Sequence, residues 1–168
     1  MPAIVGLQTR TAAPAVPLNI WERRLWLVRA AQHLRSRCAA AGLVLPSRLT
    51  VTSGTTQVVN GAYALGECWP IATTAEGMPA IVIWDGLIDP VTILSTLLHE
   101  LIHAADDCRS QHGPWFASWA QSLGLVGLPA TSAGPQLHRA LGRVACILGA
   151  YPDVRHGYVA YANGRMLA

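Results

Sequence analysis

The chain of 168 residues is 52% hydrophobic and 12% charged. This composition excludes a solvated, disordered polymer, and the length suits one domain with a single core. The net charge of +3 falls short of the dense basic patch that phosphate binding normally needs, and charged residues and a proline interrupt the apolar stretches around Ile81 and Leu94 well before the roughly 20 residues that span a membrane. We expect a cytoplasmic or nucleoid-associated protein with no membrane partner.

The four cysteines are widely separated along the chain, at Cys38, Cys68, Cys108 and Cys146. They form no Cys-x-x-Cys pair, which excludes a zinc ribbon within this sequence and favours reduced thiols. Cys68 and Cys108 are close in sequence to other candidate metal ligands but lack the spacing of a ligand motif. We interpret both as core or incidental residues.

The first predicted element follows a proline-marked stretch, residues 1–18, which we interpret as a flexible leader without a secretory signal. Asn19 is suited to cap a helix from about Ile20 to Ala41 that packs on a sheet. Its predicted packing face consists of the apolar residues that recur at helical spacing, namely Trp21, Leu25, Val28, Ala31 and Leu34. Its arginines are interpreted as a solvated face, namely Arg23, Arg24, Arg29, Arg35 and Arg37.

Three β-rich runs follow, bounded by turn-forming residues, at Arg48–Ser53, Ala62–Trp69 and Ala80–Trp84. They predict a small, mainly antiparallel three-stranded sheet. Packed against the first helix and followed by further helices, this sheet predicts an α+β fold.

After the third of these runs, the apolar residues recur at the spacing of a helix. Asp89 is a natural N-cap and Pro90 suits the first helical position, so a helix is predicted from Pro90 to Ala105. Two more helices are expected from Pro114 to Leu123, where Gly124 can end the first of them, and from about Gln136 to Leu148. The predicted domain covers residues 19–152, and the predicted tail covers residues 153–168 with a short extended segment through Tyr158 and Tyr161.

The helix from Pro90 carries the sequence His99-Glu100-Leu101-Ile102-His103. Residues four apart lie on one helical face, so His99 and His103 can direct imidazole nitrogens at one Zn²⁺ ion while Glu100 acts as the general base. With six histidines and four glutamates among 168 residues, random order gives this pattern about 0.005 times. The alternative is a purely structural helix whose histidines form hydrogen bonds and bind no metal. This alternative does not explain why polar residues occur on such an apolar helix.

A catalytic zinc of this kind needs a third protein ligand. Asp106 and Asp107 continue the helix and would strain to reach a metal shared by His99 and His103. His112 follows a link that is long enough to reverse the chain, so we expect His112 as the third ligand. The two aspartates are then partners of a ligand imidazole or the end of the helix.

The segments His99-Glu100-Leu101-Ile102-His103-Ala104 and His112-Gly113-Pro114-Trp115-Phe116 resemble the SprT-like metallopeptidases, which include Spartan. The resemblance extends from about Asn19 to Leu125, and the segment from Gly124 to Pro152 is similar to compact members encoded by phages and mobile elements, which lack a zinc ribbon. It implies that His99, His103 and His112 bind zinc, that Glu100 is the general base, and that protein crosslinked to DNA is a candidate substrate.

The leading hypothesis is therefore a zinc-dependent endopeptidase that cleaves proteins or peptides, with DNA as a candidate partner. The strand Ala80–Trp84 precedes the zinc-binding helix, so a substrate could add along its edge, with Trp84 lining the cleft. An ordinary buried strand is the alternative. A second hypothesis is a non-proteolytic nucleic-acid-associated or host-interaction protein with structural zinc, and a third is a peptidase that is active only with DNA or a partner.

Overall fold

The computed structural model describes residues 18–152, 161–162 and 165–166. The predicted leader lies outside these residues except for Leu18, and so does Tyr158 of the predicted tail. Along the chain the elements are α1 Leu18–Ala41, β1 Thr50–Gly54, β2 Val58–Val59, β3 Ala62–Tyr63, β4 Gly66–Trp69, the short helix η1 Ile71–Thr73, β5 Ala80–Trp84, α2 Pro90–Ala105, α3 Pro114–Leu123, β6 Leu125–Val126, β7 Ser132–Ala133, α4 Pro135–Leu148, β8 Tyr161–Ala162 and β9 Arg165–Met166.

The predicted α+β class is confirmed, and the main sheet has three strands in the order β1-β5-β4. β4 pairs with β5 antiparallel, whereas β1 pairs with β5 parallel. The predicted strand Ala62–Trp69 is two strands: β3 turns back onto β2 through Asn60 and Gly61, which both have positive φ, and only β4 joins the sheet. β5 is therefore central, and β4 is an edge strand.

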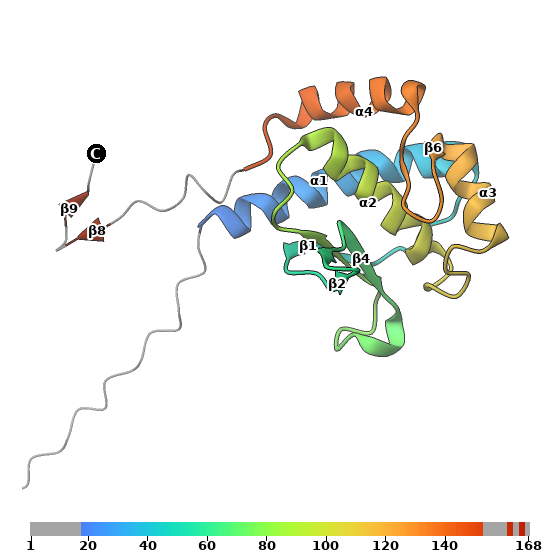
Figure 1. Cartoon of the computed structure of the whole chain (residues 1–168), viewed down its shortest axis with the longest axis horizontal. Coiled ribbons are helices and arrows are strands. Elements are labelled where there is room, and N and C mark those ends of the chain that lie inside the picture. Colours follow the sequence, from blue (N-terminus) through green and yellow to red (C-terminus); the bar gives the residue numbers. More distant parts are fainter. Residues whose placement is uncertain (1–17, 153–160, 163–164, 167–168) are drawn as a thin grey trace, which may run out of the picture.

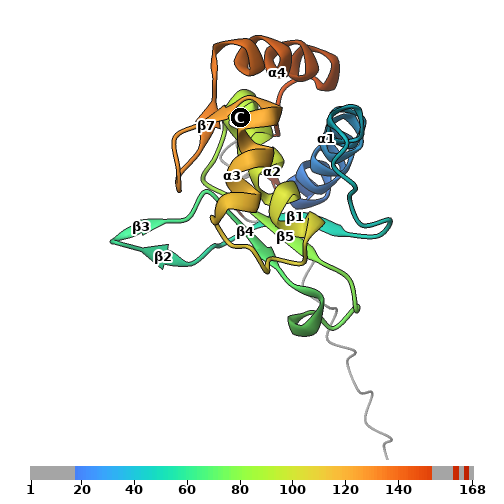
Figure 2. The ribbon, with the colours of Figure 1, turned by 90° about the vertical axis from the view of Figure 1, so that its right-hand side faces the viewer.

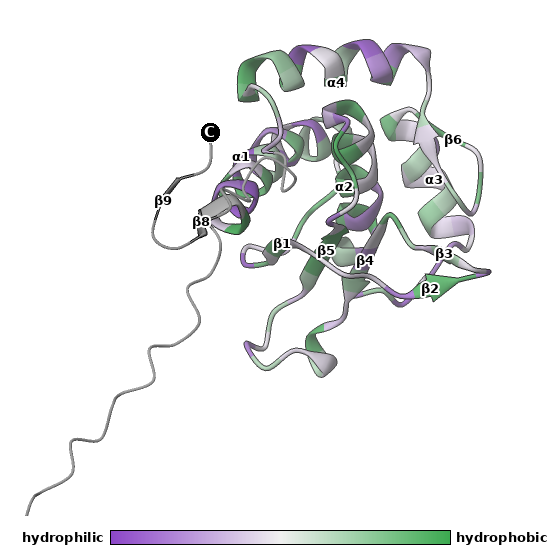
Figure 3. Cartoon of the chain, turned by 60° about the vertical axis from the view of Figure 1, so that its left-hand side comes forward, coloured by the Kyte–Doolittle hydropathy of each residue, from purple (hydrophilic) through white to green (hydrophobic). Residues whose placement is uncertain are grey.

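The helices form two layers above one face of this sheet (Figures 1 and 2). α1 and α2 contact the strands, and α4 covers the side of α1 and α2 that faces away from the sheet. α2 is apolar along most of its length (Figure 3), and its central residues are fully buried, namely Ile93, Leu94, Leu97, Leu98, Leu101 and Ile102. The helix that carries the histidine pair is thus also the centre of the core.

The predicted packing face of α1 is wrong in the first half of the helix. Trp21 and Leu25 are 62% and 59% exposed, and Val28 is also exposed. The buried stripe instead runs through the positions Trp26, Leu27, Ala30, Leu34 and Cys38. Both sets have helical spacing because apolar residues surround much of this helix, so the periodicity alone did not select one face.

The interpretation of the α1 arginines as a solvated face is wrong for Arg23, which is fully buried. Its guanidinium group donates to the carbonyl oxygens of Asp85 and Pro152 at 2.6 and 2.7 Å and lies 4.7 Å from the centroid of the Tyr151 ring. These bonds replace water for a buried charge and tie the start of α1 to the turn after β5 and to the chain after α4. Arg24 and Arg29 are exposed, as predicted.

The bounds predicted for α2 and α3 are confirmed, and α4 starts one residue earlier than expected. Asp89 accepts a hydrogen bond from the Thr92 N–H at 2.7 Å, and Gly124 ends α3 with a φ of 89°. The β6–β7 hairpin after α3 was not predicted. No helix in the described part of the chain is long and apolar enough to cross a bilayer.

Candidate metal centre

Three histidines from two segments meet at one point. His99 and His103 lie one turn apart on α2, and His112 precedes the start of α3. Their Nε2 atoms are 3.1 Å (His99 to His112), 3.2 Å (His99 to His103) and 3.3 Å (His103 to His112) apart. Hydrogen bonds between neutral rings cannot satisfy all three contacts, because each Nε2 atom either carries the hydrogen or offers the lone pair, and at least two of the three atoms must be of the same kind. The arrangement brings the three nitrogens close enough together to share one metal ion.

The environment keeps these imidazoles neutral. Burial, reinforced by the neighbouring histidines, lowers the pKa of His99 to about 3 and that of His103 to about 4. Burial also lowers the pKa of the more exposed His112. A neutral imidazole is the form that offers a lone pair to a metal, so the site is ready to bind a cation at neutral pH.

Thr131, in the β6–β7 hairpin, orients the first histidine. Its Oγ1 lies 2.7 Å from Nδ1 of His99. When Nδ1–H donates to this hydroxyl, Nε2 of the same ring keeps its lone pair and points to the other two histidines. No motif in the sequence marks Thr131, because its partner His99 lies 32 residues away in the chain.

Phe116, on the first turns of α3, supports all three rings. It is fully buried, and its ring centroid lies 4.4 Å from that of His103, 4.7 Å from His99 and 5.1 Å from His112. Packing against one rigid aromatic surface restricts the rotamers of the imidazoles. This contact explains why an aromatic residue four positions after His112 accompanies the histidines.

Glu100 is only 5% exposed and lies beside the first histidine on α2. Burial raises the pKa of its carboxyl group to about 8, with smaller contributions from Cys108 and Glu67. Gly66 of β4 packs directly on Glu100 and Thr96: a Cβ atom at this glycine would lie 2.9 Å from Glu100 Oε1 and 2.7 Å from Thr96 Cγ2. Gly66 is a second site residue that sequence analysis missed, since only the tertiary packing requires the absence of a side chain there.

A cleft of about 440 Å³ opens over these residues. One wall is formed by the three histidines and Glu100, and the other is formed by β4 and the β2–β3 hairpin. The Trp84 N–H donates to the Leu65 carbonyl at 2.9 Å, so Leu65 and Trp84 are a hydrogen-bonded pair of the antiparallel ladder. In such a ladder, every second residue directs its backbone N–H and C=O groups to the partner strand. Gly66 and Cys68 are the residues in between, so their N–H and C=O groups point away from β5, toward the free edge of β4.

The structure corrects the predicted edge for substrate binding. The strand Ala80–Trp84 is β5, which is paired on both sides and has no free edge. Trp84 lies at its end, outside the lining of the cleft, and its ring stacks on Tyr63 with centroids 5.4 Å apart. The free edge beside the histidines belongs to β4.

The aspartates that were weighed as ligands hold the loop between His103 and His112. Asp106 ends α2 and accepts from the Ser110 N–H at 2.8 Å, and Asp107 accepts from the Ile71 N–H at 2.7 Å. Neither belongs to the group of three metal-binding candidates. The interpretation of Asp106 as the end of the helix is confirmed.

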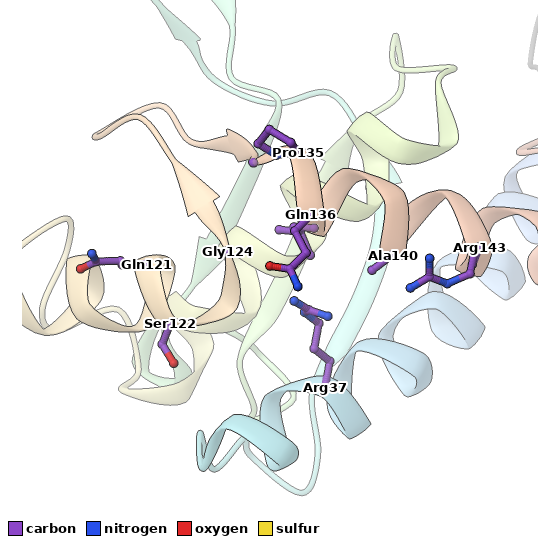
Figure 4. Close-up of a pocket in the computed structure, with 10 residues that line it drawn as sticks. Arg37, Gln121, Ser122, Gly124, Pro135, Gln136, Ala140 and Arg143 are labelled. Carbon is purple, nitrogen blue, oxygen red and sulfur yellow. The ribbon is translucent and has the colours of Figure 1, made fainter.

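A second cavity, of about 500 Å³, lies between α1, α3 and α4. Figure 4 shows the side chains of Arg37 and Gln136 directed toward one another across it. Arg37 donates to the Leu123 carbonyl at 3.0 Å, and its buried Nε has no partner among the described residues. Arg143 also lines this cavity, which is separate from the histidines.

Comparisons with known proteins give no further assignment. No family model matches the chain, and the searches found neither a curated protein nor a solved structure that is significantly similar to it.

Proposed function

We propose that the protein is a zinc-dependent endopeptidase whose active site is the cleft over α2. The observation that carries this proposal is the triangle of Nε2 atoms, with sides of 3.1 to 3.3 Å. A tetrahedral zinc ion with Zn–N distances of about 2.0–2.1 Å separates its nitrogen ligands by about 3.3–3.4 Å. His99, His103 and His112 thus fit three ligands of such a site, and all three residues line the cleft.

The chain supplies the base for hydrolysis. When bound, zinc acts as a Lewis acid that acidifies a water molecule and polarises a peptide carbonyl, and its charge favours an ionised neighbouring carboxylate. Glu100 then accepts a proton from the attacking water and delivers it to the leaving amine. Its burial, which raises the carboxyl pKa to about 8 without a metal, makes the carboxylate a stronger base than an exposed glutamate.

The edge of β4 supports a polypeptide as the substrate. An extended peptide can add to this edge as a further strand, because the outward N–H and C=O groups of Gly66 are available beside Glu100. The resemblance of the histidine motif to SprT-like metallopeptidases favours the same activity. By the same resemblance, the substrates we propose are DNA-associated or DNA-crosslinked proteins.

The decisive experiment replaces the base while keeping the metal ligands. Glu100→Gln should retain one zinc per chain and the native fold but lose casein cleavage, since an amide cannot accept the proton. The matched control is Glu76→Gln, an exposed glutamate outside the cleft, which should cleave normally. Full activity of the Glu100→Gln protein would exclude Glu100 as the base.

Metal content tests the ligand set separately. Mass spectrometry of the native protein should find one zinc per chain, and His112→Ala should bind it more weakly or lose it. His138→Ala, an exposed histidine of α4, is the matched control and should keep its zinc. A protein that purifies without any bound metal and takes up none would contradict the metal site itself.

The distribution of arginine favours a second candidate function, nucleic-acid binding. All twelve basic residues are arginines, and residues 23–66 and 108–152 contain no Asp or Glu. The cavity with Arg37 and Arg143 also borders the start of α4, where no described side chain caps the free N–H groups. Arginine and helix N-termini both bind phosphate groups.

Salt dependence separates this candidate from the first. A fluorescent single-stranded oligonucleotide should bind less tightly as salt rises, and Arg37→Gln and Arg143→Gln should weaken binding more than Arg48→Gln, which lies outside the cavity. Binding with no cleavage of casein, with or without the oligonucleotide, would favour a non-proteolytic protein with structural zinc. Cleavage only with the oligonucleotide would identify a DNA-activated peptidase.

A further inference from the structure

Two of the four cysteines are in contact beside the candidate active site. Cys68 lies on β4 and Cys108 follows α2, 40 residues later, and both line the cleft. The Cys108 thiol lies 3.4 Å from the Cys68 carbonyl oxygen, to which it donates. The other two cysteines are elsewhere: Cys38 is buried in the core, and Cys146 is exposed on α4.

The backbone holds the two thiols together. Asp107 and Cys108 have φ values of 57° and 60°. This left-handed conformation is common for Gly, Asn and Asp but rare for cysteine. The Cys108 N–H donates to the His103 carbonyl at 2.8 Å, and Asp107 binds the Ile71 N–H just beyond β4. The turn would form more easily with glycine at position 108, so its side chain needs a separate reason.

Both thiols can be reached from solvent. Cys68 and Cys108 are half-buried and both line the cleft, whereas Cys38 is buried in the core. An accessible thiol next to a second thiol is the arrangement found in cysteines that form reversible disulfides.

We propose that Cys68 and Cys108 are a reversible dithiol–disulfide pair that closes one end of the substrate cleft when it is oxidised. The expected loss of peptide cleavage on oxidation rests on the proposed peptidase function, whereas the formation of the Cys68–Cys108 bond does not. It assigns a modification site to two residues whose spacing in the sequence gives no sign of it.

The chemistry needs a low-molecular-weight disulfide, such as oxidised glutathione, as the oxidant. The Cys108 thiolate attacks one sulfur of this disulfide, forms a mixed disulfide and releases one glutathione thiolate. The Cys68 thiolate then attacks Cys108 Sγ, the Cys68–Cys108 bond forms, and the second glutathione thiolate leaves. Two protons and two electrons pass from the protein to the oxidant, which becomes two glutathione molecules.

The position of the bond gives the consequence. Cys68 belongs to the edge strand and directs its carbonyl outward, and Cys108 belongs to the loop between His103 and His112. A disulfide fastens this loop to the edge along which a substrate strand would add. It uses none of the three histidines, so oxidation should leave the metal in place while it reduces peptide cleavage.

The test treats the full-length, zinc-loaded protein with oxidised glutathione, in a Cys146→Ser background that prevents linked dimers. Intact mass should fall by about 2 Da because two hydrogens leave, and peptide mapping should find Cys68 joined to Cys108. Zinc content should not change. Casein cleavage should fall by about tenfold or more and return with dithiothreitol, as expected when a substrate no longer reaches the reacting groups.

Serine variants provide the control. Cys68→Ser should stop at the mixed disulfide of Cys108 with glutathione, and neither Cys68→Ser nor Cys108→Ser should show the 2 Da decrease. The double variant Cys68→Ser/Cys108→Ser should have the same cleavage rate with and without the oxidant. Cys38→Ser should behave like the parent. Failure to form the Cys68–Cys108 bond overturns the inference, and so does release of zinc on oxidation, which would make the thiols metal ligands. Formation of the bond in a protein that cleaves nothing in either state would contradict the peptidase function and leave the pairing intact.

Discussion

Thr131→Val tests whether the hydrogen bond to His99 prepares the metal site. Valine matches threonine in shape, so the substitution removes the hydroxyl 2.7 Å from His99 Nδ1 with little change in packing. Loss of such a partner to a ligand histidine typically weakens metal binding 10- to 100-fold, or about 1.4 to 2.7 kcal/mol. Thr131 is only half-buried, so water can partly replace the hydroxyl, and we expect an effect of about tenfold.

The assay is a competition titration of zinc against a chromogenic chelator at neutral pH. Thr131→Ser keeps the hydroxyl and should bind zinc within about twofold of the native protein, which separates the hydrogen bond from the loss of a methyl group. Equal zinc affinity in the Val variant, the Ser variant and the native protein would refute the idea that Thr131 orients His99.

Three further predictions follow from the packing and the protonation of the site. Gly66→Ala places a Cβ 2.9 Å from Glu100 Oε1, so kcat for a casein-derived peptide should fall by about 10²-fold while zinc content stays the same. Phe116→Ala empties a fully buried aromatic site and should lower the free energy of unfolding of the metal-loaded protein by about 3–5 kcal/mol, as measured by urea titration. In the metal-free protein, His99 and His103 are unprotonated in the folded state down to pH values of about 3 and 4, whereas the unfolded state protonates both below about 6.5. Glu100 has the opposite effect, because the folded state holds its proton up to about pH 8. Between pH 6 and 4.5 the unfolded state thus binds two more protons at these histidines and one fewer at Glu100, a net difference of one. The free energy of unfolding should therefore fall by roughly 1.4 kcal/mol for each unit by which the pH is lowered.

Each of these predictions has a matched comparison. Gly142→Ala, on α4, adds a Cβ with no atom within 4 Å and should leave kcat unchanged; an equal loss in both variants would mean that Gly66 has no special contact with the base. Phe116→Leu should cost less than Phe116→Ala, and equal costs would show that cavity formation is not the cause. Glu100→Gln should double the pH slope to about 2.7 kcal/mol per unit, and an unchanged slope would contradict the raised pKa of Glu100.

The features that depend only on residues close together in the sequence could be predicted from it. The period of α2, its N-cap at Asp89 and the four-residue spacing of His99 and His103 are properties of a single helix, so the histidine pair and its face follow from local geometry. The bounds of α3 follow in the same way from Pro114 and Gly124. The placing of His112 near the pair required only that a short link reverse the chain.

The sequence was ambiguous wherever more than one packing satisfied the same local pattern. The apolar residues of α1 allow two faces at helical spacing, and only contact with the sheet and α4 selects the stripe through Trp26 and Ala30. Arg23 looked like a surface residue because its carbonyl partners, on Asp85 and Pro152, come from distant segments.

Only the tertiary structure decided which residues complete the candidate site. Thr131 reaches His99 across 32 positions, Gly66 is required by the Glu100 carboxylate, and Cys68 meets Cys108 across 40 positions. The order of the strands likewise made β4, and not β5, the free edge beside the histidines. These contacts join segments that are far apart in the chain, and no periodicity or spacing records them, because their distances arise only when the sheet, α2 and the β6–β7 hairpin pack together.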